Sequence, residues 1–338
     1  MKYISRLLFV TILMFSSLIA GAQIGGESAY NFLDITASSK IYGLGGVNIS
    51  LVDSDDVMTI DQNPALLGPE MSRSIGVGYM HYVGGSNFAN AKFAHSAGDN
   101  GAWSIGLHYF GYGSVTSALP DGTITGSFSP MDMAFVGQYS HNIGERWRGG
   151  IAVKFLLSSY DAYSAFAIAT DLGVNYYDEE HDSSLSLVIA NLGGQVKKFA
   201  DKGERLPFDV RLGWSKALGN TPFNLSITAW NLTRWHLPYW DNGNGTDEPQ
   251  LKDKFMSNLF RHLIFGIEWR PNDRFYVDLA YNYKNRTDMG TYSRNFFSGF
   301  SLGAGIKVRA FGVGVSFAQH HKSAATFMLN LTTNLYDF

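Results

Sequence analysis

Two groups of residues in this sequence carry side chains of the kinds that bind metal ions. His320 and His321 are adjacent imidazoles, and residues 241–248 are rich in the oxygen ligands that calcium takes. Successive residues of a strand point to opposite faces, so the two histidines make poor joint ligands. Gly243 and Gly245 occupy positions where an EF-hand loop needs ligands, so we interpret this run as a flexible turn. The sequence therefore predicts no metal site.

A short aromatic run stands just before that turn and contains Trp235, Leu237, Tyr239 and Trp240. Aromatic side chains in an external loop can anchor a protein partner or stack on sugars. They can also belong to the aromatic girdle of a membrane barrel. Both interpretations stay open, and we take these four residues as hypothetical partner-binding residues.

Several common catalytic motifs are missing from the sequence. It has no Ser-x-x-Lys or His-Glu-x-x-His pattern and no phosphate-binding Gly-Lys-Ser/Thr loop. The chain also has no cysteine, which excludes a disulfide or a thiolate metal site. We expect His108 to face inward and to make a structural hydrogen bond. The sequence thus predicts a protein that is not an enzyme and has no cofactor.

The elements that would position these residues are strands, because apolar residues alternate with small or polar ones from residue 75 onward. In 275–284, for example, Phe275, Val277 and Leu279 oppose Tyr276, Asp278 and Ala280. We predict fourteen strands of this kind, most of them 9 to 12 residues long. They are 75–82, 88–96, 102–111, 131–141, 149–158, 166–177, 184–192, 208–217, 223–232, 261–270, 275–284, 301–309, 311–319 and 326–336.

These lengths suit strands that cross a bilayer at a tilt, which takes about 9–11 residues. Several short turns alternate with longer connections at 112–130, 193–207, 233–260 and 285–300. Bacterial barrels have short periplasmic turns and longer external loops. We therefore predict an all-β fold, a fourteen-stranded antiparallel transmembrane barrel over residues 75–338. A soluble β-domain is the weaker alternative.

The residues before the barrel divide into two further regions. Lys2 and Arg6 precede an apolar stretch at 7–18 and a small-residue cleavage site at 20–22, which predicts a signal peptide over residues 1–22. Residues 23–74 alternate poorly and contain Asn63-Pro64-Ala65, and we predict that they form a small plug in the lumen. Charged residues are 16% of the chain and its net charge is −3, so no nucleic-acid partner is expected.

Charged residues of both signs fall on the predicted inward faces of the strands. We expect them to pair across the lumen or with the plug, which favours a filled barrel over an open pore of one charge. They are Lys154, Arg211, Glu268, Arg270, Asp278, Lys284, Lys307 and Arg309.

The N-terminal segment resembles the PorQ family of the type IX secretion system, whose members are FadL-like barrels with a plug. Gly25-Gly26-Glu27-Ser28-Ala29-Tyr30-Asn31-Phe32-Leu33, Leu44-Gly45-Gly46, Asn63-Pro64-Ala65-Leu66 and Asn191-Leu192-Gly193-Gly194 carry the resemblance. It implies an outer-membrane anchor that holds a PorZ-like surface protein in one complex with a PorU sortase and a PorV-like barrel. Secreted cargo would be attached to the cell surface there.

A FadL-like transporter of hydrophobic small molecules is the alternative function. It would need a continuous apolar lumen beside a kinked strand. The inward faces read from the sequence are mostly Gly, Ser, Asn and charged residues, which argues mildly against it.

Overall fold

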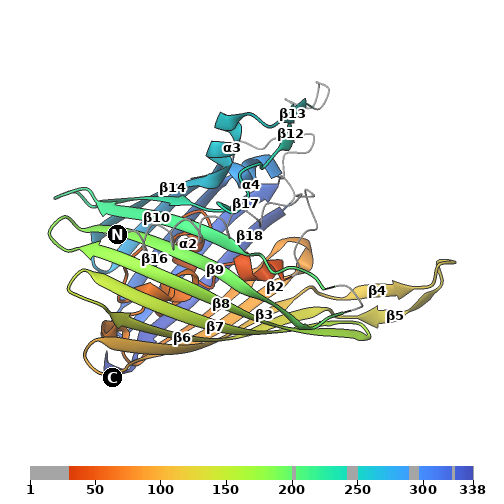
Figure 1. The fold of residues 1–338 in the computed structure, drawn as a ribbon, viewed down its shortest axis with the longest axis horizontal. Coiled ribbons are helices and arrows are strands. Elements are labelled where there is room, and N and C mark those ends of the chain that lie inside the picture. Colours follow the sequence, from red (N-terminus) through yellow and green to blue (C-terminus); the bar gives the residue numbers. More distant parts are fainter. Residues whose placement is uncertain (1–29, 200–202, 242–249, 289–296, 322–323, 338) are drawn as a thin grey trace, which may run out of the picture.

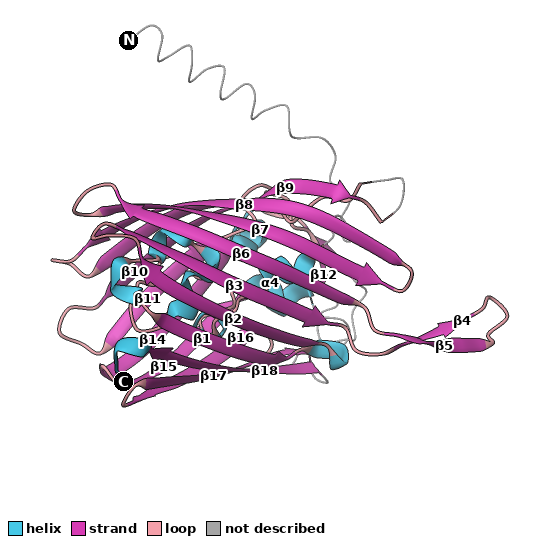
Figure 2. Cartoon of the chain, turned by 90° about the horizontal axis from the view of Figure 1, so that it is seen from below, coloured by secondary structure: helices cyan, strands magenta, loops and turns pink. Residues whose placement is uncertain are grey.

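The computed structural model describes residues 30–199, 203–241, 250–288, 297–321 and 324–337. Fourteen antiparallel strands form a closed barrel (Figures 1 and 2). The first and last wall strands close it, with Ser74 opposite Asn334 and His81 opposite Phe327. The wall strands are β1 (Ser74–His81), β2 (Asn87–Ser96), β3 (Gly101–Gly111), β6 (Met131–Asn142), β7 (Trp147–Tyr160), β8 (Tyr163–Asp178), β9 (Ser183–Lys197), β10 (Asp209–Ala217), β11 (Phe223–Ala229), β14 (Leu263–Asn272), β15 (Phe275–Asn282), β16 (Phe300–Val308), β17 (Phe311–His321) and β18 (Ala324–Asn334).

The alternation along each strand separates an outer apolar face from an inner one. In β3, Ile105 is 56% exposed on the outside, while Ser104 and His108 are buried inside. Apolar side chains cover the outer face of the other wall strands in the same way. Such a belt is stable only against lipid, and closure pairs every wall strand on both sides. The protein is therefore an outer-membrane barrel.

The two ends of the barrel differ in their connections. Short turns join the strands at one end, where the chain also terminates (Figure 1). The longer loops lie at the opposite end, which we take as the external end. Among the described residues, no helix has the length and apolar character needed to cross a membrane.

The fourteen predicted strands are confirmed, but several of their predicted ends are wrong, among them 336, because residues 335–336 belong to a 3-10 helix, and 192, because that strand continues to Lys197. β11 stops before residues 230–232, because Asn231 has a left-handed backbone with φ 54°. Residues 261–262 end helix α3 (Phe255–His262), and 283–284 begin helix α4 (Tyr283–Asp288). At 230–232 and 283–284 apolar and polar residues go on alternating, although the regular strand pairing has ended.

The external loops contain elements that the sequence analysis missed. β4 (Val115–Ala118) and β5 (Ile124–Phe128) form a hairpin that extends far beyond the barrel (Figures 1 and 2). β12 (Tyr239–Asp241) and β13 (Gln250–Lys252) form a second ribbon, and helix α3 follows it. Strands this short contain too few residues for a period to be recognised. A 3-10 helix, η5 (Val83–Gly85), joins β1 to β2, and η6 (Leu335–Asp337) follows β18.

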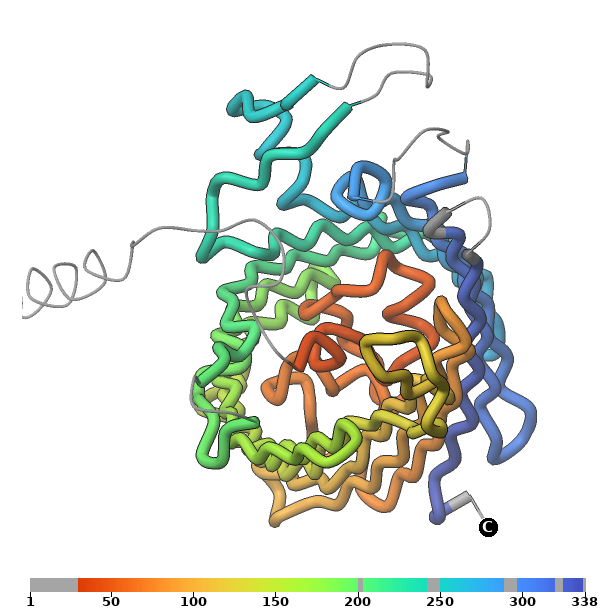
Figure 3. Tube along the Cα trace, turned by 90° about the vertical axis from the view of Figure 1, so that its right-hand side faces the viewer, coloured from red at the N-terminus to blue at the C-terminus, as the bar shows by residue number. Residues whose placement is uncertain are grey.

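Residues 30–73 lie inside the barrel as a compact chain of short helices (Figure 3). They are η1 (Asn31–Asp34), α2 (Ser39–Gly43), η2 (Val57–Gln62), η3 (Pro64–Leu66) and η4 (Pro69–Met71). Three side chains cap them: Ser38 accepts from Ile41 N–H, Asp56 from Met58 N–H, and Asn63 from Ala65 N–H. Polar caps satisfy backbone donors that would otherwise be buried. We call residues 30–73 the interior segment. The predicted signal peptide and residues 23–29 lie outside the described residues.

Candidate functional site in the barrel lumen

A buried ionic cluster joins the interior segment to the wall. Lys40 on α2 lies 2.6 Å from a carboxylate oxygen of Asp53 and 2.6 Å from one of Glu268 on β14. Arg270, also on β14, lies 2.9 Å from Asp53 and 3.2 Å from Glu268. Nearby, both carboxylate oxygens of the fully buried Asp278 lack a hydrogen bond within the described part of the chain. A single unpaired charge buried in this way would destabilise the folded protein, so the charged groups of the cluster are stable only as a set.

The environment of this cluster changes the acidity of the interior-segment groups. Burial by itself would raise the pKa of Asp53, but Lys40 and Arg270 hold that pKa well below its usual range. The same carboxylates outweigh burial at Lys40 and raise the pKa of its ammonium. Asp56 has no such cation partner. Burial and the neighbouring charge of Asp53 raise the pKa of Asp56 to about 6.

Further ion pairs join the interior segment to other wall strands. Asp61 on η2 accepts a hydrogen bond from Lys92 of β2 at 2.9 Å and lies 3.1 Å from His108 Nε2. Arg211 on β10 lies 2.8 Å from Asp34 of η1. The prediction that His108 faces inward is confirmed. The expected pairing of wall charges with the interior segment is found again at Arg211.

The eight predicted lumen charges do not all behave alike. Arg211, Glu268, Arg270 and Lys307 pair with the interior segment, the last one with Asp55 at 2.7 Å. Lys154 pairs instead with the wall residue Asp171, and Asp278 is buried without a hydrogen bond. Two placements are wrong: Lys284 lies on α4 outside the wall strands, and Arg309 occupies a tight turn with φ 54°.

The predicted plug motif Asn63, Pro64 and Ala65 lies against two wall glycines. The Asn63 amide donates to Ile49 O at 2.7 Å, and its oxygen accepts from Ala65 N–H at 2.9 Å. A Cβ added at Gly150 would lie 2.4 Å from the Pro64 carbonyl carbon, and one at Gly173 would lie 2.2 Å from Asn63 Oδ1. The motif therefore packs against the wall at two glycines, where no wall side chain would clash with it.

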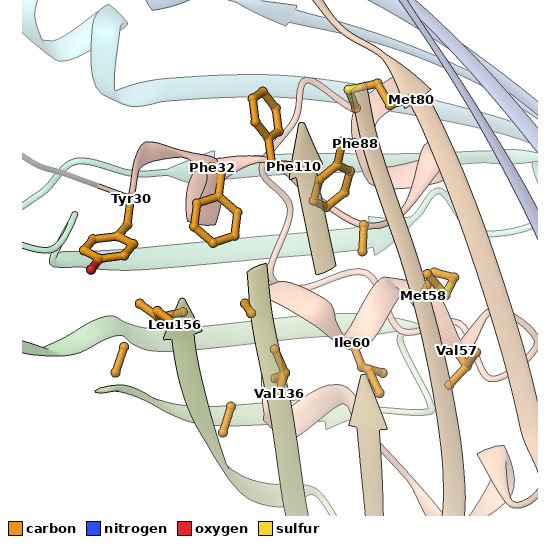
Figure 4. Packing of buried hydrophobic residues seen from close by; sticks show 14 of the residues in the cluster. Tyr30, Phe32, Val57, Met58, Ile60, Met80, Phe88, Phe110, Val136 and Leu156 are labelled. Carbon is orange, nitrogen blue, oxygen red and sulfur yellow. The ribbon is translucent and has the colours of Figure 1, made fainter. Parts of the chain in front are cut away.

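The inward faces of the wall strands are mostly small, polar or charged, as the sequence predicts, but the external half of the lumen also contains a cluster of large apolar side chains. Met80, Phe88, Phe110, Leu156 and Met328 point inward from five different strands and are buried. Tyr30 and Phe32 of the interior segment pack among them (Figure 4). The sequence analysis weighted the many inward Gly and Ser residues and overlooked these large side chains, which lie on five of the strands. An apolar cluster of this kind is one part of the continuous apolar lumen that the transporter requires.

The wall beside this apolar cluster is irregular. The pairing of β8 with β9 shifts register between Phe166 and Ala167 and again between Thr170 and Leu172. At the second shift Asn191 has a left-handed φ of 57°, and its N–H donates to Asp171 at 2.8 Å. Bulges bend a strand locally and weaken its ladder. The segment Asn191-Leu192-Gly193-Gly194 therefore marks a bent part of the wall.

A cavity of about 190 Å³ opens near the periplasmic end of the lumen. Its lining includes Asp53, Asp56, Arg270 and Lys307. It is smaller and more polar than typical ligand pockets, which enclose about 300–1,000 Å³ and are mostly apolar. The external half of the lumen is filled by protein side chains in this conformation.

The four hypothetical partner-binding residues differ in accessibility. Trp235 stacks on His262 with a ring separation of 5.1 Å, and Leu237 is half-buried. Tyr239 is buried, with its hydroxyl 2.8 Å from that of Tyr283. Trp240, by contrast, is 62% exposed. Tyr239 is thus less accessible than Trp240, and the partner-binding role of the four residues stays a prediction.

The two groups of possible metal ligands in the sequence cannot be placed in the structure. Residues 242–249 lie outside the described residues, as do the side chains of His320 and His321. A group that the sequence analysis missed, Asp178, Glu180 and His181, gathers in a periplasmic turn, but it is largely exposed and Arg146 lies 3.4 Å from Asp178. Exposed acidic turns with a cation partner need no metal.

Comparison with known proteins supports the fold and leaves the family open. No family model and no curated protein matches the sequence. The toluene transporter TbuX of Ralstonia pickettii matches with a TM-score of 0.54 and 11% identity, over 90% of this chain and 98% of TbuX. The toluene transporter TodX of Pseudomonas putida gives 0.55 and 10%, over 88% and 97%. A Pseudomonas aeruginosa FadL homologue gives 0.51 and 11%, over 88% and 98%. The chain thus has the FadL-like barrel fold.

Proposed function

We propose that this barrel is a non-enzymatic outer-membrane transporter of hydrophobic small molecules. The observation that carries this proposal is the apolar cluster in the external half of the lumen, formed by Phe88, Phe110, Leu156 and neighbouring residues. Its position beside the bulged pairing of β8 and β9 adds support, because a bent wall offers a lateral route for an apolar molecule. The transporters among proteins of similar fold favour the same function.

In this conformation the interior segment fills the proposed binding region. Tyr30 and Phe32 occupy the space that a ligand would take. Transport therefore requires η1 to withdraw, and the Asp34–Arg211 pair would break as it does. Because the deeper ion pairs of Lys40 hold α2, we expect η1 to move while α2 stays docked.

Uptake of radiolabelled toluene and oleate tests this function. The full chain would be produced in a host strain that lacks its own hydrophobic-compound transporters. We expect uptake above the empty-vector level, and a loss of at least several-fold in the variant Phe110→Asn with Leu156→Asn. The matched control is Leu119→Asn with Ile124→Asn on the exposed β4–β5 hairpin, which should transport normally. A correctly assembled barrel that takes up neither compound would overturn the proposal.

A second candidate function is the anchor of a type IX attachment complex, as the resemblance to the PorQ family implies. It is favoured by the ion pairs that fix the interior segment and by the long β4–β5 hairpin, which reaches away from the membrane. The partners would be a PorZ-like surface protein, a PorU sortase and a PorV-like barrel. The fold comparisons favour the transporter over this role.

Immunoprecipitation from detergent-solubilised outer membranes separates the two functions. Recovery of a sortase, a surface protein and a second barrel with the tagged chain would establish the anchor. Recovery of the barrel alone, with an apolar ligand detected by mass spectrometry, would establish the transporter.

A further inference from the structure

Helix α3 on the external side has its polar and apolar faces reversed relative to an ordinary surface helix. Its polar residues Asn258, Arg261 and His262 are buried. Its apolar residues Phe255, Met256 and Phe260 are 63%, 57% and 43% exposed. A surface helix of a globular protein turns its apolar stripe toward the core. Here the apolar stripe lacks cover from the described part of the chain.

The buried polar face explains why the helix holds this orientation. Asn258 donates to Asp253 at 2.7 Å and accepts from Leu237 N–H at 3.0 Å. Arg261 bonds to Thr287 and Asp288 of α4 at the barrel rim. The His262 ring nitrogens lie 2.9 Å and 3.1 Å from the carbonyl oxygens of Trp230 and Trp235. These bonds fix the helix with its aromatic side chains outward.

The position of α3 connects this face with the lipid-facing belt. The helix ends at His262 and β14 begins at Leu263, so the two are continuous. On β14, Phe265 and Trp269 already face the membrane. In Figure 3, which looks along the barrel from outside, α3 and the β12–β13 ribbon stand beside the ring of wall strands and not above its opening. The helix thus lies where the barrel wall leaves the outer leaflet.

We propose that the apolar face of α3 lies in the outer leaflet of the membrane, at the boundary between head groups and acyl chains. Amphipathic helices that rest on membranes bury their apolar face about 5–10 Å into that boundary. Trp235 packs against Phe255 at 5.3 Å and supports this face, and the exposed pair Trp240 and Leu251 on the adjoining ribbon adds to it. Lys254 is exposed at the start of the helix and is suited to a lipid phosphate. The proposal holds for either function considered above.

The β4–β5 hairpin provides a contrast within the same molecule. It extends along the barrel axis away from the membrane (Figures 1 and 2), and Leu119 in its turn is exposed. A probe at position 119 should therefore stay in water in any lipid composition.

Site-directed fluorescence in nanodiscs tests the proposal. Because the chain has no cysteine, Met256→Cys and Leu119→Cys each provide a single labelling site in the full-length protein. With an environment-sensitive fluorophore at position 256, we expect blue-shifted emission and strong quenching by lipids that carry a nitroxide near the head group. The probe at position 119 should show neither effect. Ile151→Cys, in the middle of the lipid-facing belt, is the positive control.

The outcomes separate lipid from a protein partner. If position 256 behaves like position 119 in nanodiscs, the proposal is wrong. If position 256 is exposed in nanodiscs but protected in native outer membranes, a protein covers this face and the proposal is also wrong. Loss of quenching in a Phe255→Ser, Phe260→Ser background, with the barrel still assembled, would support it further.

Discussion

At the scale of single residues, Lys40 is the main connection between the interior segment and the barrel. Its ammonium is buried, bonds two carboxylates, and lies 4.3 Å from the centre of the Tyr276 ring. Surface ion pairs contribute little, but removing one member of a buried pair leaves an uncompensated charge. The strength of the cluster therefore depends on all its members being present.

Lys40→Met should destabilise the protein strongly. Leaving Asp53 and Glu268 without their shared cation should cost about 3–5 kcal/mol. The measurement is the temperature at which the purified barrel loses its compact, fast migration on a gel. Lys252→Met, on the external ribbon, is the matched control and should migrate like the unmodified protein. Adding Glu268→Gln to Lys40→Met should recover part of the loss, and no recovery would contradict the charge argument.

Asp56 makes stability depend on pH in a defined window. Its pKa in the folded protein is about 6, against an ordinary value of 3.8. The folded state therefore holds this proton more tightly than the unfolded state. Asp56 favours the folded state most at low pH, and this contribution is lost as the pH rises from about 4 to about 6.

Asp56→Asn should remove that dependence, since asparagine can still cap η2 and does not ionise. We expect the variant to gain stability relative to the unmodified protein as the pH rises from 4 to 7. Urea-unfolding midpoints across this range measure the difference. The exposed turn variant Asp99→Asn should follow the unmodified curve, and an equal slope for Asp56→Asn would refute the assignment.

At the scale of elements, the strands were predictable because each one has an apolar face toward the lipid and a different face toward the lumen. Phe275 and Val277 meet lipid while Asp278 meets the lumen, and this repeats for the length of the wall. The loop elements were not predictable in this way. α3 was missed because its first six residues fall in the predicted loop 233–260, its last two fall in a predicted strand, and its apolar side faces outward.

The candidate site was only partly predictable for a related reason. Mixed charges on inward faces indicated a filled lumen, because unpaired charges inside a barrel need partners. The partners themselves, such as Lys40 with Glu268, are 228 positions apart, and no local pattern connects them. The apolar cluster depends on where inward residues of different strands meet, which is set by strand tilt and register.

The contact between the plug motif and the wall predicts a specific effect of a single methyl group. Gly150→Ala would place a Cβ 2.4 Å from the Pro64 backbone, whereas at Gly137 on the adjacent strand nothing lies within 4 Å. Overpacking of this kind costs about 1–3 kcal/mol. We expect Gly150→Ala to lower the temperature at which compact migration is lost and to expose η3 to protease. Gly137→Ala should do neither, and equal behaviour of the two variants would argue against docking at this site.

At the scale of the whole molecule, a wide barrel has a filled interior. Fourteen strands enclose enough space for a channel, but residues 30–73 occupy it and bond to several wall strands. The segment contacts the wall both by ion pairs and by apolar packing along its length. If η1 withdraws, as the proposed transport requires, the ion pairs of Lys40 and Asp61 keep the rest of the segment against the wall.

Conductance in a planar bilayer follows from this arrangement. The full-length protein should pass no large steady current, since the interior segment and its ion pairs block the lumen. Lys40→Met combined with Arg211→Met removes pairs at two places along the segment and should produce frequent open-channel events. Lys252→Met with Lys254→Met keeps the interior intact and should stay silent. A large open-pore current in the unmodified protein would mean that the segment leaves the lumen in a membrane. The ion pairs would then be too weak to hold it, and the stability predicted for Lys40 would fail with them.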